Sequence, residues 1–435
     1  PPLVGKPVPI GAMSPHTCRF GDGTGSKRKD GMTSTLDEQQ TKSRSVDGPG
    51  RPFETGRVLT MTIGHWVHDT YQAFLAPLLP VFVEKLSLST AQVGFLSACV
   101  QIPSILQPFI GHLADRLSLR YFVIVSPAVT AIAMSLLGVM PSYGLMILLL
   151  LVSGVSSASL HAVGPVMTGR VSGPALGRGM GLWMVGGELG RTVGPLVAVT
   201  ALGTLTLKGM PWLMIGGLAA SLLLYVRLRD IPVRTGGAGP EGERNWSRAL
   251  RAMGVMLLPL GGIIFARAFL LSALTIYLPL FLHREGTSLW LAGASLSILE
   301  GAGVVGAFLG GSLSDRFGRR RVLATCLILT PLLMLVFLAA QGWIRFPLLL
   351  LMGGPAFAVT PAIMAMVQES FPENRALANG IYMASSFGLR AVAILLLGVA
   401  GDHLGLRTGF LLSALVLLAA TPLVAFLPKS PASQG

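Results

Sequence analysis

Nine ionisable side chains occupy positions inside segments that are otherwise apolar. At the centre of a bilayer a charged side chain costs about 2.5–3.5 kcal/mol on insertion scales, so such residues persist where they pair, face water or bind a ligand. They are therefore the first candidates for chemistry in this chain. The nine residues are His65, His68, Asp69, His161, Glu188, Arg191, Arg267, Glu300 and Arg390.

The carboxylates of this set are candidate proton carriers. A carboxylate whose arginine partner moves away between two states of a protein binds a proton in one state and releases it in the other. Glu188 precedes Arg191 by three residues, a spacing that allows the two to pair on one helix face. The predicted proton-coupling residues are Asp69, Glu188 and Glu300.

The basic members of the set favour a small anionic or polar substrate. No nucleophile–base pair emerges, so no catalytic residue is predicted and the protein is expected not to be an enzyme. A pair of histidines one turn apart beside Asp69 makes only a minimal metal site without evident further ligands, so neither a metal nor a cofactor is expected. The predicted substrate-binding residues are His65, His68, His161, Arg191, Arg267 and Arg390.

Structural roles are the alternatives for several of these residues. Glu188, Arg191 and Glu300 form either a buried salt bridge that fixes helix packing or a bridge that opens in one state. His161 is either a ligand or a hydrogen-bond donor between helices. A stripe of glycines before Pro195 indicates close helix packing and also resembles an exporter motif; it consists of Gly186, Gly187, Gly190 and Gly194.

Arg390 has two further interpretations that involve no substrate. A long basic side chain can snorkel towards the membrane surface. Alternatively, its guanidinium can bond to an amide on a neighbouring helix, for which Gln101 and Gln107 are the candidates.

The elements that carry these residues are apolar and of membrane-spanning length. Of 435 residues, 52% are hydrophobic and 12% are charged, whereas soluble proteins carry about 25% charged residues. The mean hydropathy is +0.67. The net charge of +14 lies in short loops and the N-terminal tail rather than on one soluble face, which argues against a nucleic-acid partner. Three scattered cysteines without a CxxC spacing support neither disulfides nor zinc.

Twelve apolar segments of about 20 residues predict twelve transmembrane helices. The fold class expected is an all-α integral membrane protein with two pseudo-symmetric six-helix bundles, over 57–227 and 252–428. A cytoplasmic linker over 228–251 joins them, and cytoplasmic tails are expected over 1–56, which we interpret as disordered, and 429–435. The predicted spans are 58–83, 90–113, 120–140, 144–168, 178–204, 209–227, 252–282, 288–313, 320–340, 344–367, 376–400 and 407–427.

Lysine and arginine counts orient these spans. With both termini in the cytoplasm, the internal loops carry 15 basic residues and the external loops carry five, as the positive-inside rule requires. Counted from the cytoplasmic ends, Asp69, Arg191, Arg267, Glu300 and Arg390 all lie about 12–15 residues deep, roughly 18–23 Å at 1.5 Å per residue. They therefore form one layer near the midplane, where transporters of this architecture bind substrate.

A ten-residue motif occurs twice between apolar segments. Gly111-His-Leu-Ala-Asp-Arg-Leu-Ser-Leu-Arg120 recurs 200 residues later as Gly311-Ser-Leu-Ser-Asp-Arg-Phe-Gly-Arg-Arg320. At an offset of 199, Pro80 aligns with Pro279, His68 with Arg267, Trp183 with Tyr382 and Arg191 with Arg390. A charged loop repeated at the same place in two halves predicts a transporter built from parallel repeats.

Twelve helices with this repeated loop resemble the major facilitator superfamily over roughly residues 58–427. The resemblance implies that helices one, four, seven and ten line a central cavity and that the loop is a conformational motif at the cytoplasmic interface of the halves. Asp115 and Asp315 are then expected to cap a neighbouring helix or to pair with an arginine. The implied motif residues are Gly111, Asp115, Arg116, Arg120, Gly311, Asp315, Arg316 and Arg320.

A narrower resemblance is to the fosmidomycin-resistance type of efflux carrier. It rests on short pieces in the family's order: Gly64-His65 with Asp69, Leu88 through Gly94, Gln107-Pro108 with Gly111, Gly154 through His161, Gly186 through Leu196, Arg267 through Ser272, and Gln368-Glu369 with Pro372. Unlike that type, this chain has Ala162-Val163 after the helix-four histidine and a charged pair on helix five. The resemblance implies efflux, and hence drug resistance, by proton antiport.

The function expected is proton-coupled export of a small organic molecule by alternating access. No Gly-x4-Gly-Lys-Ser/Thr loop is present, so an ATP-driven pump is not expected. Proton-coupled uptake of an organic anion or sugar is the alternative within transport, and a non-transporting receptor or scaffold is the alternative from another class. We expect a monomer in the inner membrane whose partners are substrate, protons and lipid.

Overall fold

The computed structural model describes residues 53–107, 109–110, 119–230, 246–371 and 375–428. These residues are almost entirely helical. The helices of the first half are α2 (Thr55–Gln72), α3 (Leu75–Leu86), α4 (Thr90–Gln101), η1 (Ile102–Leu106), α6 (Leu119–Leu136), α7 (Tyr143–Val171), α8 (Leu176–Gly209) and α9 (Met214–Leu228). Those of the second half are α10 (Trp246–Ser272), η6 (Ala273–Tyr277), α11 (Leu278–Arg284), α12 (Leu289–Phe317), α13 (Arg319–Ala339), α14 (Arg345–Ser370), α15 (Arg375–Leu404) and α16 (Leu406–Ala420).

Nine helices of the described ranges are long and apolar enough to cross a membrane, and one of them, Gly177–Leu228, contains two of the twelve predicted spans. The remaining two predicted spans are interrupted. The span over 58–83 is divided between α2 and α3. The span over 90–113 continues from α4 as a 3-10 segment and then passes out of the described residues.

The helix breaks follow the internal repeat. In the first half, α2 ends at Gln72 and α3 contains Pro80. In the second half, at the corresponding offset of 199, α10 gives way to the π-helical segment η6, and Pro279 opens α11. A proline ring has no N–H to donate to the carbonyl four residues earlier, which for Pro279 belongs to Thr275 within η6, so the chain widens there. Irregular backbone at this depth is typical of helices that line a transport path.

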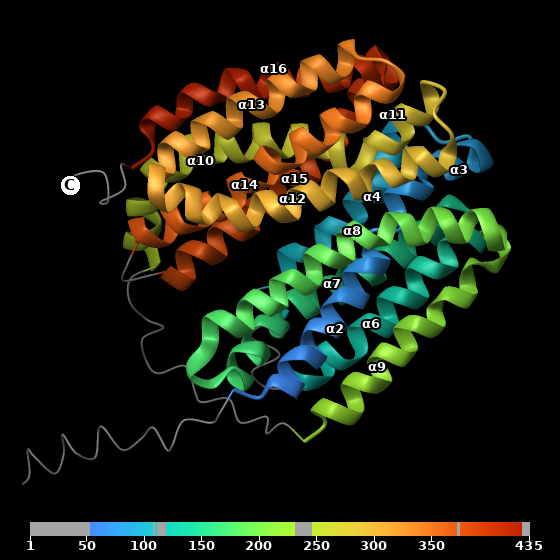
Figure 1. The fold of residues 1–435 in the computed structure, drawn as a ribbon, viewed down its shortest axis with the longest axis horizontal. Coiled ribbons are helices and arrows are strands. Elements are labelled where there is room, and N and C mark those ends of the chain that lie inside the picture. The colour runs from blue at the N-terminus through green and yellow to red at the C-terminus, as the bar shows by residue number, and fades with distance from the viewer. Residues whose placement is uncertain (1–52, 108, 111–118, 231–245, 372–374, 429–435) are drawn as a thin grey trace, which may run out of the picture. The chain divides into compact units, whose positions relative to one another are not determined.

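Two helix pairs make the most extensive contacts between the halves. Within the first half, α2 packs against α6, α8 and α9, and within the second half α14 packs against α12 and α13. Between the halves, α4 packs along α15 and α8 packs along α12. Figure 1 shows α8 and α12 as neighbours from opposite halves. We call the surface formed by these two pairs the seam.

Two predicted boundaries differ from the structure. Helix α2 begins at Thr55, inside the tail predicted over 1–56. Helix α10 begins at Trp246, inside the linker predicted over 228–251. Here a helix extends beyond its apolar segment, because helix formation needs propensity and not hydrophobicity alone. The tail over 429–435 and most of the tail over 1–56 lie outside the described residues.

The outer end of the seam is held by hydrogen bonds from one half to the other. The carboxylate of Asp402 on α15 accepts from the backbone N–H groups of Thr90 and Ala91, at 2.5 and 2.9 Å. These N–H groups open α4 and have no partner within the helix. On the same side, His283 of α11 lies 3.2 Å from the carboxylate of Glu84 on α3. The described contacts therefore tie the halves together at the side predicted to be external.

Replacement of Asp402 by alanine is expected to loosen this outer contact. Loss of a cap of this kind costs about 1 kcal/mol, enough to shift a two-state equilibrium between open and closed forms roughly fivefold. Spin labels at Trp212 and Trp343, which are 72% and 85% exposed at the outer ends of the two halves, should report a larger population of long distances. Asp230→Ala, at the opposite end, is the matched control. Identical distance distributions for Asp402→Ala and the wild type would contradict this role.

Candidate functional site

Close packing of α2 against α8 brings the charged layer together. A Cβ atom at Gly190 would lie 2.6 Å from the carbonyl oxygen of Trp66 and 2.8 Å from Cβ of Asp69. A Cβ atom at Gly187 would lie 2.7 Å from Nε2 of His65. Only glycine permits these approaches, so the structure supports the packing interpretation of the stripe. The two helices run side by side in Figure 1.

Arg191 of α8 lies among three carboxylates. Its guanidinium is 3.0 Å from Oδ2 of Asp69 on α2 and pairs with Glu188 one turn earlier on α8. Its Nε atom is 4.0 Å from Oε2 of Glu300 on α12. The predicted pairing of Arg191 with Glu300 across the seam is therefore present. The sequence analysis groups Arg191 with the substrate-binding residues, but the structure places it in a cluster of ion pairs. We call Arg191, Asp69, Glu188 and Glu300 the seam cluster.

His65 and His161 meet at the other side of Asp69. His65 Nε2 is 3.5 Å from Oδ2 of Asp69 and 3.4 Å from Nε2 of His161, which belongs to α7. His161 Nε2 is 3.8 Å from Oδ1 of Asp69. The ring of His65 also stacks on Trp183, at 4.0 Å between ring centroids. His65 and Asp69 are buried, whereas 31% of the His161 side chain is exposed.

His68 is not part of this group. It is fully buried, and neither ring nitrogen has a hydrogen-bond partner among the described residues. Its ring centroid lies 5.9 Å from that of His161. The sequence places His65 and His68 together in a substrate cavity, and in this conformation neither is exposed. On α2 the two rings differ in direction by about 60°, because residues three apart are rotated by that angle.

Arg267 and Arg390 lie in the second half and form no ion pair with a carboxylate of the described residues. The Nη2 atom of Arg267 donates to the carbonyl of Ala356 at 3.1 Å and to the hydroxyl of Thr360 at 2.6 Å, both on α14. The Nη2 atom of Arg390 donates to the hydroxyl of Thr275 at 3.1 Å. The alternative in which Arg390 bonds to Gln101 or Gln107 is wrong for this conformation, because its side chain bonds to η6 within its own half.

Charge is thus unevenly distributed in the layer. Asp69, Glu188 and Glu300 share one guanidinium at the seam. Within the described part of the chain, no carboxylate lies within 4.0 Å of Arg267 or Arg390, and the Nε atom of each has no partner. An arginine inside a membrane is stable only with a counter-charge, dipoles or water nearby. The second half therefore offers two guanidinium groups to an anion.

The repeated loop is described in its second copy. Asp315 pairs with Arg319 at 2.5 Å, which confirms the predicted partner type, and Arg319 also reaches Glu369 at the end of α14, at 2.8 Å. Glu369 belongs to the Gln368-Glu369 piece of the resemblance described above, but its pairing with the arginine of the repeated loop is visible only in the structure. Gly311 has open space around it, Arg316 stacks on Phe317, and Arg320 donates to the carbonyl of Pro428.

The first copy of the loop lies mainly outside the described residues. Gly111, Asp115 and Arg116 belong to that part of the chain. Arg120 is described, and its guanidinium donates to the carbonyl of Arg229 after α9. The predicted role of the first copy therefore stays a prediction.

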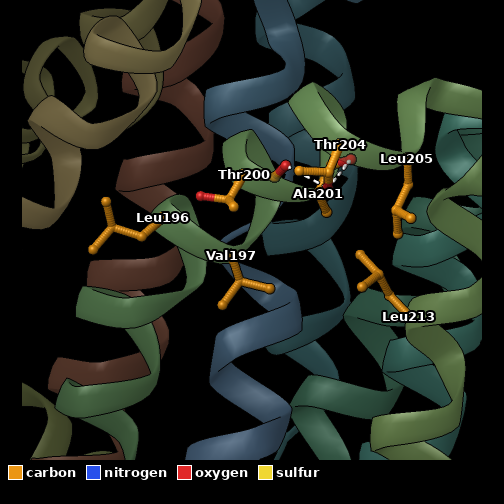
Figure 2. Close-up of a pocket in the computed structure, with 7 residues that line it drawn as sticks. All are labelled: Leu196, Val197, Thr200, Ala201, Thr204, Leu205 and Leu213. Atoms are coloured by element: carbon orange, nitrogen blue, oxygen red, sulfur yellow. Dashed lines mark hydrogen bonds between the residues drawn. The ribbon is translucent and has the colours of Figure 1, made fainter.

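Two surface grooves lie away from the charged layer. Figure 2 shows a groove of about 430 Å³ beside α8, lined by Leu196, Val197, Thr200, Ala201, Thr204, Leu205 and Leu213. A second, of about 390 Å³, lies between α12, α13 and α14. Neither contains a charged residue, so neither can balance the charge of an ionic substrate. Their apolar walls suit lipid chains.

Comparison with known proteins supports a transporter. The family model described as "Major Facilitator Superfamily" matches residues 61–314 and 301–435. The Fosmidomycin resistance protein of Escherichia coli (strain K12) is 23% identical over 381 residues, covering 85% of this chain and 92% of that protein. The uncharacterized MFS-type transporter YfnC of Bacillus subtilis (strain 168) is 24% identical over 397 residues, covering 89% and 96%.

Solved structures share the fold. A bacterial homolog of the human lysosomal transporter Spinster, inward-facing and unoccupied, superposes with a TM-score of 0.71 at 17% identity, covering 86% of this chain and 97% of that one. A D-xylose-proton symporter superposes with a TM-score of 0.69 at 17% identity, covering 87% and 99%. At these identities the likeness establishes two six-helix bundles spanning a membrane, as the hydropathy predicts, and nothing about substrate.

Proposed function

We propose that this chain, which belongs to the Major Facilitator Superfamily, is a secondary active transporter that exports a small organic anion in exchange for protons. It is a multi-pass membrane transporter, and the proposal concerns substrate, coupling ion and direction. The observation that carries it is the unequal pairing of charge in the midplane layer. Three carboxylates share Arg191 at the seam, while Arg267 and Arg390 have no carboxylate partner among the described residues.

Arg267 and Arg390 are the proposed anion-binding residues. Among the described residues each guanidinium donates to neutral oxygens and forms no ion pair within 4.0 Å, so its charge can attract a ligand. Planar guanidinium groups bind carboxylate, phosphate or phosphonate oxygens through paired N–H groups. A transported anion would balance the positive charge of the second half of the layer, and that charge would be unbalanced again when the anion leaves.

Glu300 is the proposed proton carrier. It is buried, it belongs to the second half, and its Oε2 atom has only a distant partner in Arg191 of the first half, at 4.0 Å. Asp69 and Glu188, also candidates from the sequence, remain with Arg191 on the first-half side. When the halves rock, Arg191 stays with its own half, and Glu300 loses that counter-charge and keeps only the more distant one of Arg390 in its own half. A proton then restores neutrality.

Export and drug resistance follow by analogy rather than from geometry. The name of the Escherichia coli relative denotes resistance to fosmidomycin, which efflux would provide. The outer contact of Asp402 with α4 belongs to a state that takes up substrate from the cytoplasm, if both termini are cytoplasmic as the basic loops predict. The proposal includes an inner-membrane location and a monomer.

Reconstituted protein tests the proposal directly. Proteoliposomes that enclose a pH-sensitive dye would be challenged with phosphonates, organic acids, sugars and cationic drugs, under a proton gradient of either sign. Proton movement with anions alone, in the direction opposite to the anion, supports antiport. Movement in the same direction as substrate would indicate uptake by symport, and movement with sugars or cations but not anions would contradict the substrate class.

Arg267→Ala is expected to weaken transport strongly. Removing an unpaired guanidinium that binds the substrate should raise the half-saturating concentration of the anion roughly tenfold or more, because charge-assisted hydrogen bonds contribute about 1.5–3 kcal/mol. Arg407→Ala is the control, since that guanidinium lies at the outer end and is 3.6 Å from Glu285. Half-saturating concentrations that are the same for Arg267→Ala and the wild type would remove Arg267 from the anion site.

A further inference from the structure

The hydrogen bonds of two histidines decide which ring nitrogen is free of hydrogen in the neutral form. Nδ1 of His65 lies 2.8 Å from the carbonyl oxygen of Trp183, and Nδ1 of His161 lies 2.8 Å from that of Ser157. A carbonyl oxygen only accepts hydrogen bonds, so each Nδ1 carries the hydrogen. In the neutral ring, each Nε2 atom therefore bears a lone pair.

These two lone pairs share one space with the carboxylate of Asp69. The two Nε2 atoms are 3.4 Å apart, and they lie 3.5 and 3.8 Å from the oxygens Oδ2 and Oδ1 of Asp69. Three acceptors at such distances repel one another unless a cation lies among them. Arg191 contacts only the Oδ2 side of this group, at 3.0 Å, and donates nothing to the histidines among the described contacts.

The separation of the two Nε2 atoms, 3.4 Å, matches that of a tetrahedral metal site, and the carboxylate of Asp69 presents one oxygen to each histidine at 3.5 and 3.8 Å. Zinc–ligand distances of about 2.0–2.2 Å place neighbouring ligand atoms about 3.3–3.6 Å apart. The ligand atoms of His65, Asp69 and His161 all lie within 4.8 Å of one another. Histidine ligands of metals donate the other ring N–H to a carbonyl or carboxylate, which fixes the tautomer. Both histidines here already make that bond to a backbone carbonyl.

We propose that His65, Asp69 and His161 bind a divalent transition-metal cation of the Zn²⁺ class, with a fourth position left for water or a ligand. Two imidazoles and one carboxylate are a donor set that suits Zn²⁺ and neighbouring metals better than Mg²⁺ or Ca²⁺. The surrounding charge favours a cation, because Asp69, Glu188 and Glu300 outnumber Arg191 and the nearby Arg390. The exposed part of His161 provides access.

Metal binding can be measured without any transport. Absence of metal binding can therefore be distinguished from absence of the proposed anion–proton exchange. Purified full-length protein free of any histidine tag would be titrated with Zn²⁺ against a chromophoric chelator, and with Co²⁺ while its visible absorption is recorded. One equivalent should bind, and Co²⁺ should give the strong absorption of tetrahedral coordination. Zn²⁺ should also raise the melting temperature, because the ligand binds the folded state.

His161→Gln is the decisive variant, since its side chain is the least buried of the three. It should weaken Zn²⁺ binding roughly tenfold or more and abolish the Zn²⁺-dependent rise in melting temperature. His283→Gln, at the outer end beside Glu84, should change neither. Wild-type protein that binds no metal, or a site unaffected in both His161→Gln and His65→Gln, would overturn the proposal. The Co²⁺ spectrum of the wild type decides the case if a variant does not fold.

Discussion

Glu300→Gln is expected to reduce substrate-driven proton movement to the level of protein-free liposomes. Glutamine keeps the shape of the side chain and can still accept a hydrogen bond, but it cannot take up a proton. Because Glu300 is 93% buried (7% exposed) and its Arg191 partner comes from the other half, no nearby carboxylate can replace it without moving across the seam. The measurement is the pH-dye assay with the best anion from the screen.

Exchange of labelled substrate separates coupling from folding. With equal substrate on both sides and no proton gradient, Glu300→Gln should still exchange substrate, because the anion site at Arg267 and Arg390 is intact. Glu285→Gln is a matched control within the same half; its carboxylate pairs with Arg345 at 2.9 Å near the outer end. Proton movement that persists in Glu300→Gln but is lost in Asp69→Asn would place the carrier on Asp69 and contradict the assignment.

Gly190→Ala is expected to destabilise the protein by forcing α2 and α8 apart. The added methyl would meet the carbonyl oxygen of Trp66, Cβ of Asp69 and the backbone nitrogen of Thr70, at 2.6–2.9 Å. Backbone atoms cannot rotate away, so α2 and α8 must separate. Overpacking of this kind costs about 1–3 kcal/mol, and the displacement also moves Asp69 away from Arg191. We expect a clear fall in melting temperature and in transport.

Gly203→Ala provides the comparison on the same helix. Its Cβ would meet nothing within 4 Å, and alanine is favoured over glycine in a helix interior by about 1 kcal/mol. The melting temperature of Gly203→Ala should therefore equal or exceed that of the wild type. Equal melting temperatures for Gly190→Ala and Gly203→Ala would show that the two helices are not held at the distance seen here.

Depth in the membrane is predictable from the chain because it depends on counting. A helix rises 1.5 Å per residue, so the distances of Arg191 and Glu300 from their loops fix both near one level. Their pairing across the seam, with Nε and Oε2 4.0 Å apart, follows that expectation. The internal repeat at an offset of 199 can also be read from the sequence alone. The break after α2 in the first half and the π-helical segment η6 in the second lie at corresponding positions of this repeat.

Neighbours around a helix axis are not predictable in the same way. Arg390 reaches Thr275 instead of an amide on α4, and Arg319 links Asp315 to Glu369. The same offset of 199 that aligns His68 with Arg267 also aligns His161 with Thr360, the residue that accepts from Arg267. Both halves thus join their first and fourth helices by a polar contact, but this symmetry is visible only once one of the contacts is known.

By itself, the sequence determined the membrane fold, and it predicted the two halves, the repeated loop and the level at which the charges lie. These are properties of composition, length and periodicity along single helices. Only the tertiary structure decided that His65 meets His161 while His68 has no partner, and that Arg191 is held by three carboxylates. The physical reason is that contacts between helices depend on how each helix is rotated and how closely it approaches its neighbour. Here the glycines of α8 determine which face of α8 meets α2 and how closely the two helices approach.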